Sequence, residues 1–98
     1  KVKMISMNEF STEMTLEFDG PIYISVDLDG LDPAFAPGVS HPEPGGLSTR
    51  DVLKIISKIK GDVIGADIVE FNPNKDLNNL TANVAAKLLK ELMSRMLS

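Results

Sequence analysis

The order of the predicted elements, strand, helix, strand, helix, indicates an α/β fold built on a parallel sheet. Two β-rich runs, residues 21–29 and 62–71, are separated by one amphipathic helix and followed by another. A crossover of more than a dozen residues between two strands is typical of a right-handed βαβ unit with parallel pairing. The 98 residues, 43% hydrophobic and 24% charged, have the composition of one small folded domain.

The first strand is predicted from the run Pro-Ile-Tyr-Ile-Ser-Val-Asp-Leu-Asp at residues 21–29, which Gly20-Pro21 opens and Gly30 and Asp32-Pro33 close as turn signals. The second, residues 62–71, has β-branched residues on both faces, as expected of a strand covered by helices on each side. Residues 2–6 give a weaker third strand, and residues 7–19 a short helix or an irregular link.

The first helix is predicted to begin after Ser48, because Ser48 and Asp51 have the spacing of a capping box. Apolar residues then follow at i, i+3, i+4 and i+7, and Gly61 stands where a helix-terminating glycine belongs.

The second helix is predicted over residues 80–97, with Asn78 or Asn79 as its cap. The stripe expected to face the core consists of Val84, Ala85, Leu88, Leu89, Leu92, Met93 and Met96.

Charge and composition exclude several classes of partner. A net charge of −4 disfavours nucleic acid and anionic lipid, and no run approaches the ~18 apolar residues of a membrane span. We therefore expect a soluble, cytoplasmic protein without disulfides, since the chain has no cysteine. A first residue other than Met also suggests a segment of something longer.

Carboxylates gather at the end of the first strand. Alternation along a strand places Ser25, Asp27 and Asp29 on one face, so two carboxylates become neighbours there. Their mutual repulsion is relieved by a cation, and they could straddle a pair of hard cations. The alternative is that Asp27, Asp29 and Asp32 are turn formers that cap backbone amides. A calcium loop is set aside, because its glycine and its glutamate would both be misplaced.

A longer string decides between these interpretations. Residues 25–38, Ser-Val-Asp-Leu-Asp-Gly-Leu-Asp-Pro-Ala-Phe-Ala-Pro-Gly, followed by Pro-Glu-Pro-Gly-Gly-Leu at 42–47, closely resemble the signature of the ureohydrolase family, the arginases and agmatinases. Residues 66–73, Ala-Asp-Ile-Val-Glu-Phe-Asn-Pro, resemble that family's second block, and Thr81-Ala82 resembles the start of its last helix.

The resemblance implies a three-layer α/β/α fold, of which residues 1–98 would be a single partial domain at the carboxy-terminal end. It also implies a binuclear Mn²⁺ centre that hydrolyses a guanidino carbon and releases urea. In that family the roles falling on Asp27 and Asp29 are to bridge both metals and to bind one, and the glutamate at the place of Glu70 contacts the guanidinium. The family's histidine-containing metal motifs do not occur in this chain, so the remaining ligands would lie outside it and the chain alone would be inactive.

Within the family, the Pro-Glu-Pro-Gly-Gly stretch at 42–46 favours agmatinase, which converts agmatine to putrescine and urea. Arginase, another guanidino or formimino hydrolase, a non-catalytic structural fragment, and an unrelated phosphate- or cation-binding module are the alternatives. The expected partners are a small guanidino substrate and further copies of the full-length parent.

Four nearby polar residues receive weaker assignments. His41, the only histidine, is placed on the surface or at the rim of a substrate pocket rather than on a metal. Ser25 either hydrogen-bonds one of the two aspartates or packs in the strand. Asp67 is assigned no role beyond a buried, hydrogen-bonded group, and Asp32 is interpreted as a turn former.

Overall fold

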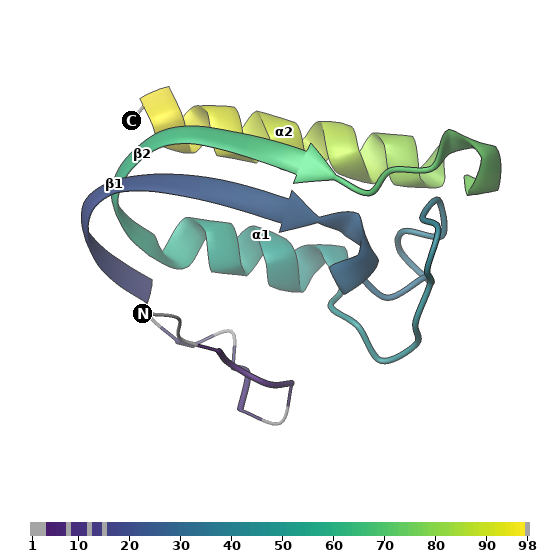
Figure 1. Ribbon diagram of the computed structural model, residues 1–98, viewed down its shortest axis with the longest axis horizontal. Helices are drawn as coiled ribbons and strands as arrows, with labels where there is room; N and C mark the ends of the chain where they lie inside the picture. The colour runs from purple at the N-terminus through teal and green to yellow at the C-terminus, as the bar shows by residue number, and fades with distance from the viewer. Residues whose placement is uncertain (1–3, 8, 12, 15, 98) are drawn as a thin grey trace.

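Among the residues that the structure describes, two parallel strands and two helices form the fold (Figure 1). The computed structural model describes residues 4–7, 9–11, 13–14 and 16–97. The elements are β1 (Leu16–Asp27), a 3-10 turn (Leu28–Gly30), α1 (Thr49–Lys58), β2 (Ile59–Val69), a second 3-10 turn (Pro73–Lys75) and α2 (Leu80–Leu97). β1 and β2 pair in parallel, so the predicted α/β class is confirmed.

β1 begins five residues before the predicted strand and ends two residues before its predicted end. Its pairing with β2 is interrupted between Glu17 and Pro21, and Gly20 takes a left-handed φ of 79° at this irregularity. The Gly20-Pro21 signal therefore marks a bulge inside the strand rather than its start. At the other end, the fully buried Leu28 begins a 3-10 turn directly after Asp27.

β2 begins at Ile59, the residue that also caps α1, so helix and strand follow each other without a loop. The prediction that Gly61 terminates the helix is wrong, because Gly61 lies inside β2 with a φ of 139°. A Cβ on this residue would collide with the side chain of Ile22 on the neighbouring strand. Glycine is needed there for its positive φ, since the Ile22 Cδ1 atom is the far end of a side chain that can shift.

The start of α1 agrees with the prediction. The Asp51 N–H donates to Ser48 Oγ at 3.0 Å, and the Ser48 N–H donates to Asp51 Oδ2 at 3.1 Å, which is the reciprocal pair of a capping box.

The start of α2 is capped by a residue that the pattern did not indicate. Asp76 accepts hydrogen bonds from the N–H groups of Thr81 at 2.8 Å and Ala82 at 3.0 Å. Burial raises the pKa of the Asp76 carboxyl, but these hydrogen bonds outweigh it and the net pKa lies below the ordinary value. The predicted caps, Asn78 and Asn79, instead form a left-handed turn with φ values of 51° and 61°.

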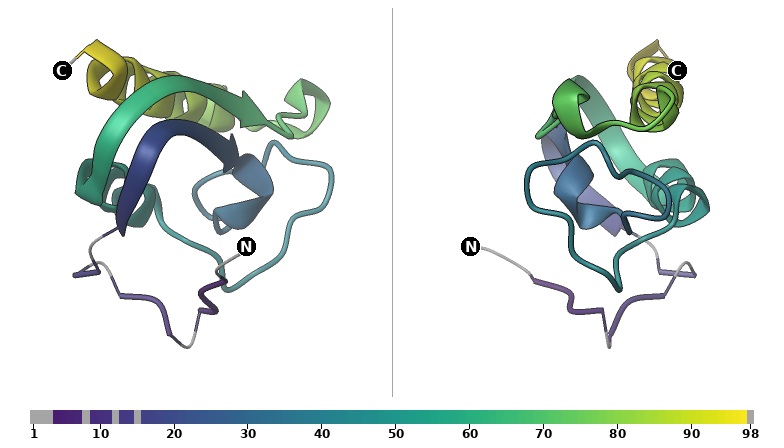
Figure 2. Two further views of the ribbon diagram at one scale, coloured as in Figure 1. Left: turned by 60° about the vertical axis from the view of Figure 1, so that its left-hand side comes forward. Right: turned by 90° about the vertical axis from the view of Figure 1, so that its right-hand side faces the viewer.

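The helices cover one side of the two strands (Figure 2). The larger core cluster comprises Val26, Leu28, Leu31, Ala36, Val39, Val52, Ile56, Val84, Leu88 and Leu92. On α2, Leu89 and Met93 do not join it, each being 49% exposed, because the stripe predicted for the core is wider than the face that packs. In the described ranges the opposite sheet face carries no helix, so only one of the two helix layers expected around the second strand lies there.

The remaining predictions concern the amino-terminal part. Residues 4–6 form no strand, and Val2 and Lys3 lie outside the described residues. Up to Met14 the described residues are turns and irregular backbone, in agreement with an irregular link, but the end of the predicted link, residues 16–19, belongs to β1. Within the described part of the chain, no helix has the length and apolar character needed to cross a membrane.

Candidate active site

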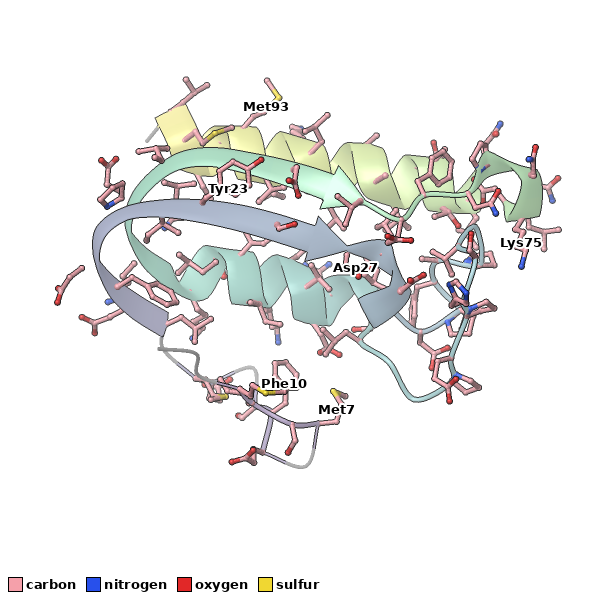
Figure 3. The ribbon with its side chains drawn as sticks, viewed as in Figure 1. Met7, Phe10, Tyr23, Asp27, Lys75 and Met93 are labelled. Atoms are coloured by element: carbon pink, nitrogen blue, oxygen red, sulfur yellow. The ribbon has the colours of Figure 1, made fainter. Side chains whose placement is uncertain are left out.

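Both strands end at the same edge of the sheet, and the predicted site residues lie at that edge. Asp27 is the last residue of β1 and stands in register with Val69, the last residue of β2, so Glu70 follows one residue beyond (Figure 3). Loop 31–47 and the segment after Glu70 lie at the same end (Figure 1). Carboxyl ends of parallel strands are where α/β folds bind ligands.

Asp27 and Asp29 are neighbours for a different reason from the one that alternation gives. β1 stops at Asp27, and the 3-10 turn that follows brings the Asp29 N–H to Asp27 Oδ1 at 2.9 Å. The period-two argument for Asp29 is therefore wrong, because that residue is not in a strand. A turn that doubles back keeps the two acids adjacent.

The two carboxylates have free acceptor capacity. Oδ1 of Asp29 is buried and receives no hydrogen bond from the described residues. Asp27 is exposed and uses Oδ1 to accept the N–H of Asp29, which leaves Oδ2 available. A buried carboxylate oxygen without a donor is costly unless a cation contacts it.

These two residues thus fit part of a site for hard divalent cations, which prefer oxygen ligands. They do not complete one: within the described ranges, no group of three or more His, Cys, Asp or Glu side chains could hold a metal ion. The other ligands would have to come from outside the described residues.

Glu70 has an unusual backbone. Its φ of 71° is left-handed, a conformation that costs a non-glycine residue about 1–2 kcal/mol. Its side chain is exposed at the strand end. An exposed carboxylate in this place can accept two parallel N–H groups from a planar guanidinium.

Loop 31–47 is folded tightly against the turn that carries Asp29. Asp32 accepts hydrogen bonds from the N–H groups of Ala34 and Gly45, both at 2.9 Å, so its assignment as a turn former is confirmed. The Ala34 N–H, then those of Gly45 and Gly46, hold the pKa of the Asp32 carboxyl below its ordinary value despite some burial. The Leu47 N–H closes the loop by donating to the Gly30 carbonyl at 3.0 Å.

Gly46 and Gly30 form a matched pair for testing this loop. A Cβ on Gly46 would lie 2.7 Å from the Asp32 nitrogen and 2.9 Å from the Gly30 oxygen, whereas one on Gly30 would meet nothing within 4 Å. We expect Gly46→Ala to destabilise the full-length parent by about 1–3 kcal/mol through overpacking, and Gly30→Ala to be tolerated. Thermal unfolding of the two variants checks this; equal melting temperatures would contradict it.

Ser25 and Asp67 contact each other across the strands. Ser25 Oγ donates to Asp67 Oδ1 at 2.5 Å and Tyr23 Oη donates to Asp67 Oδ2 at 3.0 Å. The partner of Ser25 is therefore Asp67, not Asp27 or Asp29, and the prediction that Asp67 is hydrogen-bonded is confirmed. The hydrogen bond to Asp67 is the main cause that raises the pKa of the Tyr23 phenol, with burial and the Asp67 charge adding to it.

Residues that sequence reasoning missed join loop 31–47 to the segment behind Glu70. Asn72 donates from Nδ2 to Ser40 Oγ at 3.1 Å and from its backbone to the Gly38 carbonyl at 2.7 Å. The Asn72-Pro73 pair was a turn signal that could have directed attention to this position. His41 is exposed on the same loop, next to Ser40, so its predicted rim position stays a prediction.

Comparison with known proteins identifies the family. A profile described as the arginase family matches residues 1–94. The chain belongs to the arginase family. The resemblance seen in the two motifs is thereby confirmed.

Individual members of the arginase family match most of the chain. The mitochondrial arginase 1 of Arabidopsis thaliana is 63% identical over 75 residues, and the mitochondrial agmatinase of Gallus gallus is 49% identical over 76; each match covers 76% of this chain and 22% of the relative. The structure of arginase from Medicago truncatula superimposes with a TM-score of 0.80 at 50% identity, covering 84% of this chain and 27% of that one. The chain thus spans about a quarter or less of these relatives.

Proposed function

We propose that this chain is a segment of a ureohydrolase that hydrolyses a guanidino carbon–nitrogen bond and releases urea. One observation carries the proposal: Asp27, Asp29 and Glu70 stand together at the carboxyl edge of two paired strands. Membership of the arginase family supports it. Because the chain covers 22% of its curated relatives, the activity is proposed for the full-length parent. Placement of the segment at the carboxy-terminal end, as a single partial domain, belongs to the same proposal.

The three acids divide two tasks between them in this proposal. Asp27 and Asp29 would hold a binuclear Mn²⁺ centre together with ligands from elsewhere in the parent, and when bound, the metals supply a water whose pKa is lowered toward neutrality. Glu70 accepts N–H groups of the guanidinium and so fixes the plane of the substrate. Since a planar carbon is attacked from above or below its plane, fixing the plane orients the carbon toward the Asp27–Asp29 edge.

We propose L-arginine as the preferred guanidino substrate, with agmatine as the second candidate. The Pro42–Gly46 stretch favoured agmatine. The Arabidopsis relative named arginase is 63% identical, however, against 49% for the relative named agmatinase. The two substrates differ by a carboxylate on the tail, far from the guanidinium that Glu70 would contact.

The substrate is tested with the manganese-loaded parent enzyme. We expect urea from both compounds, with kcat/KM at least about tenfold higher for L-arginine, a difference of about 1.4 kcal/mol in transition-state binding. A reversed preference would favour the agmatinase interpretation. Urea from neither compound, with manganese bound, would overturn L-arginine and agmatine as substrates and favour another guanidino compound, and urea from none of a panel of guanidino compounds would overturn the proposed function and favour a structural role.

The compartment and assembly of the parent also stay proposals. A cytoplasmic address was expected, but the relatives in Arabidopsis and Gallus carry mitochondrial names. We therefore favour a mitochondrial address for the parent, which a fluorescent fusion of the full-length protein would test. The parent is also proposed to form a homo-oligomer, which a measurement of its molar mass in solution would test.

A further inference from the structure

Two segments that are far apart in the sequence are joined beside the candidate site. The first is residues 38–40, in the loop that follows Asp29, and the second is residues 72–75, directly after Glu70. Asn72 joins them twice, through its N–H to the Gly38 carbonyl at 2.7 Å and through Nδ2 to Ser40 Oγ at 3.1 Å. Lys75 Nζ adds a third bond, to the Ser40 carbonyl at 3.2 Å (Figure 3).

The same loop is held from a second side. The Gly38 N–H donates to Oγ1 of Thr81 at 2.7 Å, and Thr81 is fully buried at the start of α2. Both polar groups of the Gly38 backbone are thus bonded to the part of the chain that follows β2. Residues 38–40 of this loop are therefore tied both to the segment after Glu70 and to the start of α2.

Asn72 also shapes its own segment. Its side-chain Oδ1 accepts the N–H of Asn74 at 3.1 Å, and its carbonyl accepts the N–H of Lys75 at 3.1 Å, which fixes the 3-10 turn. Asn72 is half-buried, but its side-chain hydrogen bonds to Ser40 and Asn74 lie at the exposed surface, so the clamp depends on several bonds acting together. Two residues earlier, Glu70 must keep a left-handed φ of 71°, a conformation that persists only where the surroundings hold it.

We propose that Asn72 is a positioning residue that holds the Glu70 carboxylate at a fixed place relative to the Asp27–Asp29 edge by clamping residues 72–75 to residues 38–40. The inference rests on the proposed function, because Glu70 is taken to bind the guanidinium. Asn72 itself touches neither substrate nor metal in this proposal. Its effect passes through the backbone of residues 70–72.

The test uses the full-length parent and the variant Asn72→Ala, with L-arginine as the probe. The substitution removes two side-chain hydrogen bonds, the one donated to Ser40 Oγ and the one accepted from the Asn74 N–H. We expect KM to rise about five- to tenfold, with a smaller fall in kcat and unchanged manganese content. In the metal-free parent, amide hydrogen exchange of residues 70–75 should become faster. The second readout does not depend on catalysis.

Three further variants make the result specific. Asn72→Asp keeps the acceptor for the Asn74 N–H and can accept from the Ser40 hydroxyl, so its KM should lie close to the wild-type value. Ser40→Ala removes one exposed hydroxyl and should raise KM about two- to threefold. This variant tests the clamp if Asn72→Ala does not fold. Asn74→Ala is the matched control, because Asn74 contributes its backbone N–H, and its KM should equal that of the wild type.

Two results would overturn the proposal. One is faster exchange at residues 70–75 with an unchanged KM, which would give the clamp a structural role only. The other is a loss of manganese that accompanies the rise in KM, which would mean that Asn72 acts on Asp27 and Asp29 instead of Glu70. Failure of the proposed function looks different: the wild-type parent would then release no urea, while the exchange rates of Asn72→Ala would still change.

Discussion

Replacing Asp27 or Asp29 with Ala in the full-length parent is expected to abolish manganese retention and urea release. Each substitution deletes a carboxylate of the pair that the 3-10 turn brings together, and the buried Oδ1 of Asp29 has no other partner among the described residues. Loss of a group that merely orients a metal ligand weakens metal binding 10- to 100-fold, so loss of a ligand should exceed about 100-fold. Metal analysis after dialysis, together with a urea assay, measures both effects.

The Asp27 result needs a control for its hydrogen bond to the backbone. Asp27→Asn keeps an oxygen that can accept the Asp29 N–H, so the turn should persist while the charge is lost. We expect this variant to melt like the wild type and yet to lose manganese. Asp19→Ala, at an exposed position near the start of β1, should change neither property. Full manganese content and activity in Asp27→Ala would refute the site.

The strands and helices could be predicted because their signals are local. The α1 capping box follows from two residues three positions apart, and the pairing of β1 with β2 follows from the length of their crossover. The acids at 27, 29 and 70 were found for a similar reason, since a family motif is itself a local pattern.

The features that were missed depend on contacts across the fold. Gly61 has the position of a helix-terminating glycine in the sequence, but it lies inside β2, next to Ile22 of the neighbouring strand and with a positive φ. Asp76 caps α2 from four residues before its first residue, because the left-handed turn at Asn78 and Asn79 folds the chain back. The clamp at Asn72 joins residues more than thirty positions apart. None of these distances can be read from periodicity.

The arrangement of the acids explains why a partial chain can carry a recognisable site. Asp29 and Glu70 belong to different strand ends, and their relative position is set by β1–β2 pairing and by the bonds of the loop between Gly30 and Leu47. Val26 and Leu28, next to the first two acids, belong to the same core cluster as Leu88 of α2, so that helix supports the site as well. No further set of metal ligands lies within the described residues, and the chain covers 22% of the Arabidopsis relative.

Replacing Glu70 is expected to separate substrate binding from metal binding. Glu70→Gln keeps the shape of the side chain and loses the charge, so the charge-assisted bonds to the guanidinium are lost, a cost of about 1.5–3 kcal/mol. We expect KM for L-arginine to rise about 10- to 150-fold while manganese content stays at the wild-type level. Glu17→Gln, at the opposite end of β1, is the matched control and should leave KM unchanged.

A second substitution at the same position uses the backbone of Glu70. Because its φ of 71° suits glycine, Glu70→Gly should relieve strain and melt at a higher temperature than Glu70→Ala, although both variants lose the carboxylate. The pair therefore gives equal losses of substrate affinity with different stabilities, which a general unfolding of the strand end could not produce. A wild-type KM in Glu70→Gln would remove Glu70 from the substrate site. A raised KM together with a loss of manganese would instead make Glu70 part of the metal centre.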